Sequence, residues 1–340
     1  MNHQTRSGSV VPAASAGEAP AALPAVDLSP GNATRNARLV WLAGLALLVA
    51  APFIGLYPVF MMKALCYAIF ACAFNLLLGY TGLLSFGHAA YLGLAAYVTG
   101  WLVRSAGWSP EFGVVAGTVL AALLGLAVGL LAIRRQGIYF AMITLAMAQM
   151  IYFVFLQAPF TGGEDGLQGV PRGTLFGLIP LASDITLYFV VLAVFVAVFL
   201  FIIRVVHSPY GQVLKAIREN EPRAVSLGYD VDRYKLLAFV LSTALAGLAG
   251  SMKTLVLGFA TLSDVHWSAS GQVILMTLLG GLGRYMGPVV GAFLVVALEK
   301  YLAPFSGWVP VAEGAVFVIC VLVFRQGIVG KLSAALKTPL

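Results

Sequence analysis

The stretch ITLYFVVLAVFVAVFLFIIRVV, residues 185–206, carries one charge, Arg204, in 22 positions. About 20 apolar residues in a helix cross the hydrocarbon of a bilayer, so this segment predicts a transmembrane helix. The rest of the chain is similar: 61% of its residues are hydrophobic, 10% are charged, and 37 of 340 are glycine. Soluble domains carry about a quarter charged residues. The chain is therefore predicted to be a polytopic membrane protein.

Nine more segments have a length and apolarity suited to a span. The C-terminal run from 271 to 303 is too long for one helix and is interrupted between Gly280 and Pro288, so we divide it in two. The sequence thus predicts an all-α bundle of about ten spans. The other segments are 39–58, 61–79, 85–104, 112–133, 137–158, 236–258, 271–282, 286–303 and 309–325.

Charge distribution predicts the orientation of the bundle. With ten spans and a cytoplasmic N-terminus, only five of the 20 Lys and Arg residues lie outside, and the positive-inside rule favours this arrangement. Both termini are then cytoplasmic, and the net charge of +7 reflects the inner loops and gives no reason to expect a nucleic-acid partner. Residues 1–38, rich in Ala, Pro and Ser, are expected to form a disordered cytoplasmic tail. Residues 39–328 form the transmembrane domain, and 329–340 a second cytoplasmic tail. The five outer residues are Lys63, Arg104, Arg172, Lys253 and Lys300.

Residues 214–235, LKAIRENEPRAVSLGYDVDRYK, interrupt the apolar pattern with nine charges in 22 positions. We call the surrounding loop, 207–235, the island. Ser208–Pro209 is typical of a helix start, and Asn220 is a suitable cap for a second helix whose first turn tolerates Pro222. Gly228 offers a left-handed stop. The pattern predicts a two-turn helix near 221–227 that exposes Ala224, Val225 and Leu227.

Two interpretations of the island stay open. It is either a solvated loop held by its neighbours or a knob that docks into a partner protein, because so short a helix needs packing for its stability. The chain contains no G-x-x-x-x-G-K-[ST] phosphate loop and no G-x-G-x-x-G motif. A transporter built from this chain would have to obtain its energy from another subunit.

A second informative stretch covers residues 75–100, NLLLGYTGLLSFGHAAYLGLAAYVTG. Ala89, Gly93, Ala96 and Gly100 share one helical face, which permits close helix packing in lipid. Upstream glycines and hydroxyls suggest a broken or re-entrant backbone, which membranes tolerate only where protein buries it or water lines it. Tight packing and a role in the transport pathway are both open here. The pathway and helix-break candidates are Asn75, Gly79, Gly82, Ser85, Gly87, Gly93, Gln149, Gly162, Gly163 and Gly166.

The last three candidates belong to FTGGEDGLQGVPRG, residues 160–173, on the predicted external side. Five glycines and a proline predict a shaped turn rather than a helix. Glu164 and Asp165 are either solvated or receive a cationic group or a docking partner.

Strongly polar residues are scarce within the predicted spans. A carrier driven by protons or sodium usually has Asp, Glu or Arg at mid-span, where ionisable groups mark function. The three cysteines lie in apolar runs and the four histidines are scattered, so the sequence predicts neither a disulfide framework nor a metal site. The span residues concerned are Asn75, His88, Gln149, Ser242, Thr243 and Glu313.

Four motifs together resemble a known family. They are GYTGLLSFGHAAYLGLAAYVTG, TGGEDGLQGVP, AIRENEPRAVSLGYDVDRYKLLAFVLSTALAGLAGSM and GGLGRYMGPVVGAFLVV, in this order between residues 39 and 328. Their sequence is similar to the permease subunits of branched-chain amino acid ABC importers of the LivM type. The resemblance implies half of an inner-membrane pore in bacteria, paired with a LivH-like permease. Two cytosolic ATPase subunits, which hold ATP and Mg, and a periplasmic binding protein complete such an importer.

The resemblance also implies a role for the short helix of the island. It looks like the coupling helix that sits in an ATPase cleft, while the chain itself binds no cofactor and catalyses no reaction. The importer pattern E-A-A-x-x-x-G is matched only at Ala224 and Gly228, since Pro222 and Arg223 occupy its first two places. The loop thus resembles this subfamily rather than importers in general. The residues carried over are Glu219, Asn220, Glu221, Ala224, Leu227 and Gly228.

Two other classes of function compete with the permease. A self-sufficient secondary carrier is disfavoured by the missing mid-span charges, and a membrane-embedded enzyme by the lack of a His/Asp/Glu/Cys cluster at one depth. Within the family the substrate stays open, since similar permeases are linked to urea, short amides and aromatic acids as well as branched-chain amino acids.

Overall fold

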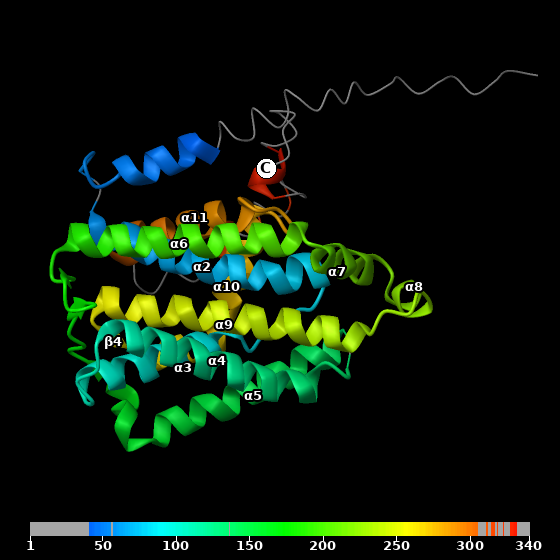
Figure 1. Cartoon of the computed structure of the whole chain (residues 1–340), viewed down its shortest axis with the longest axis horizontal. Helices are drawn as coiled ribbons and strands as arrows, with labels where there is room; N and C mark the ends of the chain where they lie inside the picture. The colour runs from blue at the N-terminus through cyan, green and yellow to red at the C-terminus, as the bar shows by residue number, and fades with distance from the viewer. Residues whose placement is uncertain are drawn as a thin grey trace, which may run out of the picture.

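The fold is a bundle of long helices that run roughly along one axis, as the computed structural model shows (Figure 1). The structure describes residues 41–55, 57–135, 137–304, 311, 314–316, 318, 322 and 327–331. The predicted tail 1–38, most of the predicted span 309–325 and residues 332–340 lie outside this part.

The helices of the bundle follow a short apolar helix, Trp41–Ala50. Five of those described are long and apolar enough to cross a membrane, namely α2, α4, α5, α6 and α9, as expected of a multi-pass membrane protein. The helices are α2 (Pro58–Thr81), α3 (His88–Arg104), α4 (Pro110–Ala132), α5 (Ile138–Gln157), α6 (Asp184–His207), α7 (Pro209–Glu219), α8 (Glu221–Ser226), α9 (Val231–Leu257), α10 (Trp267–Gly280) and α11 (Gly287–Leu302).

Two of the predicted span boundaries can be judged directly. The division of 271–303 is confirmed, because α10 ends at Gly280 and α11 begins at Gly287. The prediction of one continuous helix over 39–58 is wrong. The first helix ends at Ala50 and turns follow, since Pro52 cannot donate a helical hydrogen bond and Gly55 takes a φ of 87°.

The core lies around α2 and α9. In the most apolar stretch of α2, 89% of the residues are buried, against 28% for α4 and 33% for α5. α2 packs on α9, α11 and α6, while α3 and α4 pack on the other side of α9. The outer faces of α4, α5 and α6 remain uncovered within the described chain, as expected for surfaces that meet lipid or another subunit.

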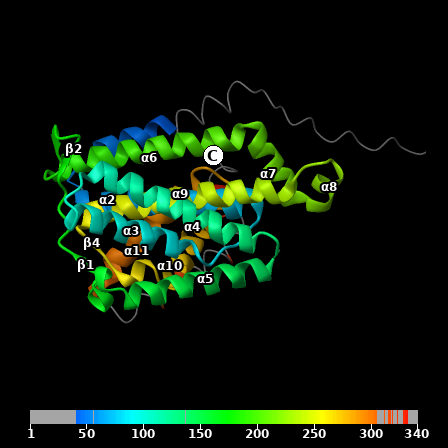
Figure 2. The same ribbon diagram turned by 60° about the horizontal axis from the view of Figure 1, so that its bottom comes forward.

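The two ends of the bundle differ. At one end α8 projects beyond the other helices, and α7 lies beside the start of α9 (Figures 1 and 2). We call this the island end. At the opposite end two small antiparallel ribbons close the loops: β1 (Leu167–Gln168) pairs with β4 (Phe259–Ala260), and β2 (Thr174–Leu175) pairs with β3 (Ile179–Pro180). We call this the strand end.

Candidate functional site

The local structure of the island follows its sequence signals. The Ser208 side chain accepts a hydrogen bond from the Gly211 amide and begins α7, and Asn220 Oδ1 accepts from the Arg223 amide (3.1 Å) and begins α8. Gly228 takes a φ of 87° directly after α8, and its amide donates to the Val225 carbonyl (2.9 Å). The predicted caps and the left-handed stop are confirmed.

The surface of α8 differs from the prediction at one position. Val225 and Leu227 are 57% and 67% exposed, as expected, but Ala224 is only 2% exposed. Its small side chain faces the gap between α7 and α9, where it packs with Ile217 and Val231. The prediction that Ala224 is exposed was wrong, because periodicity along six residues cannot tell which face meets the neighbouring helices.

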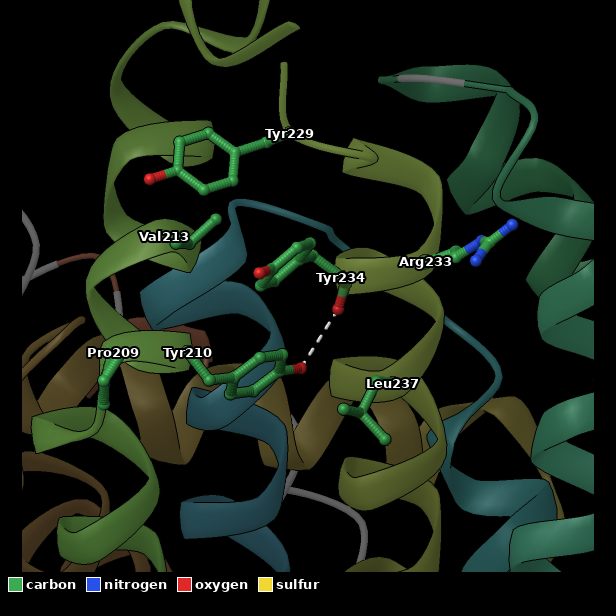
Figure 3. Close-up of a pocket in the computed structure, with 7 residues that line it drawn as sticks. All are labelled: Pro209, Tyr210, Val213, Tyr229, Arg233, Tyr234 and Leu237. Carbon is green, nitrogen blue, oxygen red and sulfur yellow. Dashed lines mark hydrogen bonds between the residues drawn. The ribbon is translucent and has the colours of Figure 1, made fainter. Parts of the chain in front are cut away.

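The base of the island is held by tyrosines and one buried ion pair. Tyr210 on α7 stacks on Tyr234 on α9, and its hydroxyl donates to the Tyr234 carbonyl (3.0 Å), as Figure 3 shows. Burial, together with Tyr234, raises the pKa of the Tyr210 phenol, so it stays a neutral donor at physiological pH. Lys235, 3% exposed, pairs with Glu221 (2.7 Å) and thereby ties α8 to α9. An open groove remains, lined by Pro209, Tyr210, Val213, Tyr229, Arg233, Tyr234 and Leu237, in which Arg233 points away from the tyrosines.

Beneath the island, three segments distant in sequence meet at the end of α2. The Asn75 side chain accepts a hydrogen bond from the Gly283 amide (3.0 Å) and donates to the Arg284 carbonyl (3.0 Å), both in the break between α10 and α11. Arg218 of α7 donates through Nη1 to the Gly79 carbonyl. A Cβ on Gly79 would lie 2.8 Å from the Gly283 amide nitrogen, so glycine is needed for this approach.

The segment 82–87 between α2 and α3 is irregular backbone inside the bundle. The amides of Phe86 and Gly87 are bound by the hydroxyls of Thr144 (3.2 Å) and Ser85 (3.3 Å), which replace the missing helical partners. Side chains thus satisfy donors that lipid could not. The predicted helix break is confirmed, and it contains Gly82, Ser85 and Gly87.

α3 begins deep within the bundle. His88 Nε2 lies 2.8 Å from Ser242 Oγ, and Ser242 in turn donates to the Ala73 carbonyl (2.5 Å). Ser242 stands eleven positions into α9, or about 16 Å from the island end of that helix. Since His88 is its neighbour, the segment 82–87 re-enters the bundle to roughly half its length. Three aromatic rings, Phe74, Tyr91 and Phe239, enclose the imidazole.

The small-residue face of α3 serves close packing. A Cβ on Gly93 would lie 2.9 Å from the Cα of Val265, and a Cβ on Gly100 would lie 2.7 Å from a methyl group of Leu167. Ala89 adds a hydrogen bond from its amide to Ser270 Oγ (2.9 Å). Tight packing, one of the two interpretations of this face, is confirmed by these distances.

The glycine-rich loop 160–173 lies at the strand end. It forms two 3-10 turns, Pro159–Thr161 and Gly163–Asp165, before β1, and five of its glycines have positive φ. The prediction of a shaped turn is confirmed. Glu164 and Asp165 are exposed, as the solvated interpretation expects.

The pathway candidates therefore lie in several separate places rather than in one site. Asn75, Gly79 and Gly82 meet at the island end, with Ser85 and Gly87 in the re-entrant segment that leads inward. Gly93 packs farther along α3, and Gln149 lies half-buried on α5. Gly162, Gly163 and Gly166 stand at the strand end.

Two ion pairs among helices were missed from the sequence. Lys253 and Asp264 are 6% and 5% exposed and form a salt bridge, with Lys253 Nζ 5.4 Å from the Tyr67 ring centre. Lys63 pairs with Glu299 (2.8 Å), which also accepts from Gln272 (3.0 Å). The partners are eleven and 236 positions apart, so only the apolar neighbours of each charge hinted at burial.

Comparison with known proteins agrees with this architecture. The family described as the branched-chain amino acid transport system permease component matches residues 57–324. The high-affinity branched-chain amino acid transport system permease protein LivM of Escherichia coli K12 is 28% identical, over 93% of this chain and 79% of its own. The LivH permease of the same system and strain is 24% identical, over 78% of this chain and 91% of its own. No solved structure matches the chain.

The extent of the family match settles the family, because it includes the helix break, the island and the split at Gly280–Gly287. The chain belongs to the branched-chain amino acid permease component family of ABC transporters.

Proposed function

We propose that the chain is the LivM-type permease subunit of an ATP-driven importer in the bacterial inner membrane. In this proposal it spans the membrane about ten times with both termini in the cytoplasm. It forms half of a pore whose other half is a LivH-like permease. A periplasmic binding protein delivers branched-chain or related hydrophobic amino acids. ATP and Mg are bound by two cytosolic ATPase subunits.

The observation that supports this proposal most is α8. A capped helix of six residues projects from the bundle and presents Val225 and Leu227 to solvent between charged residues. Exposed apolar side chains on so short a helix are stabilised when a partner groove covers them. Asn220 and Gly228 set the start and end of α8, and Glu221 anchors it to Lys235. Glu219 is the last residue of α7, directly before the cap. The proposed contact with the ATPase is made by Leu227 and Val225, with Ala224 as internal packing.

A pull-down from the native host tests whether the chain assembles with the other subunits of an importer. We expect the detergent-solubilised chain to retain two ATPase subunits and a second permease, identified by mass spectrometry, and the variant lacking residues 219–228 to lose the ATPases but keep the sister permease. A matched variant, Val225→Asp/Leu227→Asp, leaves the caps intact and should lose the ATPases as well. Recovery of the chain alone, together with gradient-driven transport in vesicles, would support a secondary carrier instead.

The substrate is tested separately in the reconstituted importer. We expect uptake of labelled leucine that depends on ATP and on the binding protein, and that unlabelled isoleucine or valine reduces. Competition by urea, short amides or aromatic acids, with none by valine, would show that the importer carries a different solute.

A further inference from the structure

Helix α7 is fixed to the bundle near both of its ends. Near its start, Tyr210 donates to the carbonyl of Tyr234 on α9 (3.0 Å), visible as the dashed line in Figure 3. Near its end, Arg218 donates to the carbonyl of Gly79 on α2. The two anchors are eight positions, or about 12 Å, apart along the helix. Arg218 is the anchor closer to α8, which begins three residues later at Glu221.

The carbonyl bound by Arg218 has no partner within its own helix. It is one of the last four of α2, and the neighbouring Leu78 carbonyl is already occupied by the Gly82 amide (3.2 Å). A guanidinium at the carboxyl end of a helix also interacts favourably with the helix dipole. Arg218 therefore ties α7 to the end of the most buried helix of the bundle.

The break between α10 and α11 joins the same group of contacts. Gly283 donates to Asn75 Oδ1 (3.0 Å), and a Cβ on Gly283 would lie 3.1 Å from Arg218 Nη1 and 3.2 Å from the Gly79 carbonyl. The irregular backbone of the break thus passes directly against both Arg218 and the end of α2. A shift of Arg218 therefore disturbs both segments.

We propose that Arg218 is a positioning residue for transport, which passes displacement of α8 to the end of α2 and, through Asn75, to the α10–α11 break. This inference rests on the proposed function, since it requires that an ATPase moves α8. The end of α2 leads directly into the re-entrant segment 82–87, so movement there changes the backbone that runs into the middle of the bundle.

Arg218 is one of several contacts that hold α7 in place, and the others remain when it is replaced. Its side chain is exposed overall, whereas Leu214 and Ile217 bury the inner face of α7, and Tyr210 anchors its start. Replacing Arg218 with Met keeps the length of the side chain and removes its charge and donors. We therefore expect that Arg218→Met folds, assembles and docks the ATPase but transmits its movement poorly.

The experiment measures solute uptake and ATP hydrolysis on the same proteoliposomes, with the complete importer reconstituted. For Arg218→Met we expect wild-type recovery of ATPase subunits and uptake per ATP reduced about tenfold or more, as for the loss of a charged hydrogen bond. Arg218→Lys, which keeps the charge and one donor, should retain part of the coupling. The control Arg233→Met removes a charge from the same island without touching α2 and should leave uptake per ATP unchanged.

A double variant checks that the contacts act in series. If they do, Arg218→Met/Asn75→Ala lowers uptake per ATP no further than the worse single variant. Losses that multiply, unchanged uptake per ATP in Arg218→Met, or loss of ATPase recovery in that variant would each overturn the inference. Failure of the wild-type chain to recover an ATPase would instead overturn the proposed function.

Discussion

At Gly228, within the proposed docking loop, the backbone conformation alone favours glycine. Its φ of 87° lies in the left-handed region, yet a Cβ placed there would meet no atom within 4 Å. A side chain at this position is therefore opposed by strain and not by a clash. A substitution at Gly228 therefore tests the backbone conformation without changing side-chain packing.

We predict that Gly228→Val uncouples transport while the protein remains in the membrane. A β-branched residue in the left-handed region costs about 1–2 kcal/mol or more, which shifts the end of α8 away from its docked position. Gly228→Asn, which tolerates this conformation, should retain uptake. The measurement is ATP-dependent uptake with membrane abundance determined by immunoblot; normal uptake by the Val variant would contradict the role given to the turn.

The buried pair Lys253–Asp264 concerns stability rather than coupling. We predict that Asp264→Asn lowers the free energy of unfolding by about 3–5 kcal/mol, because it leaves the Lys253 ammonium buried without its counter-charge. Asp184→Asn is the matched control. Its ion pair with Arg172 has a 45% exposed carboxylate and should contribute only about 0–1 kcal/mol.

Thermal unfolding of the purified variants in detergent distinguishes these two outcomes. Equal shifts in Tm for Asp264→Asn and Asp184→Asn would show that water reaches Lys253 and that the pair is not effectively buried.

At the scale of helices, the approach of α3 to the segment at Val265 depends on Gly93. We predict that Gly93→Ala destabilises the protein by about 1–3 kcal/mol, since the new methyl group would press on the Val265 backbone. Gly271→Ala on α10 is the control, because nothing lies within 4 Å of its Cβ position, and it should be neutral or stabilising by up to about 1 kcal/mol. The comparison requires only Tm values, and a loss of the same size in both variants would show that the close approach to Val265 is not the cause of the destabilisation.

Local signals in the sequence predicted the parts of the site that depend on neighbouring residues. Ser208, Asn220 and Gly228 contact residues only three or four positions away, so the helix caps and the stop after α8 could be predicted from the sequence. The helix break after Thr81 could be predicted in the same way. The burial of Ala224 and the contact of Arg218 with α2 depend on where α7, α8 and α9 meet. That arrangement is set by the whole bundle, and no periodicity along the chain encodes it.

The same distinction applies to the spans. Length and apolarity located α2, α4, α5, α6 and α9, because each must satisfy its backbone within one helix. The depth to which 82–87 returns into the bundle was not predictable. It follows from hydroxyl groups on α5, α9 and α10. Thr144 binds Phe86 of the segment, and Ser242 and Ser270 bind His88 and Ala89 at the start of α3.

At the scale of the whole molecule, the island end and the strand end should face opposite sides of the membrane. We predict that Leu227→Cys reacts with a membrane-impermeant thiol reagent only in inverted vesicles, and Glu164→Cys only in right-side-out vesicles or spheroplasts. Cys66 and Cys72 are buried, so a Cys320→Ser background suffices. Labelling of both positions from the same side would refute the orientation taken from the positive-inside rule.

The central place of α2 has a consequence for biogenesis. α2 ends at Thr81, but α9 and α11, which cover it, begin at Val231 and Gly287. At about 5–20 residues per second of synthesis, roughly 8–30 s pass before α9 follows α2 from the ribosome. During that interval the translocon or lipid must shelter a helix whose small and polar residues, such as Asn75 and Gly79, are shaped for protein neighbours. The nascent chain is therefore most vulnerable to quality-control proteases before its C-terminal half arrives.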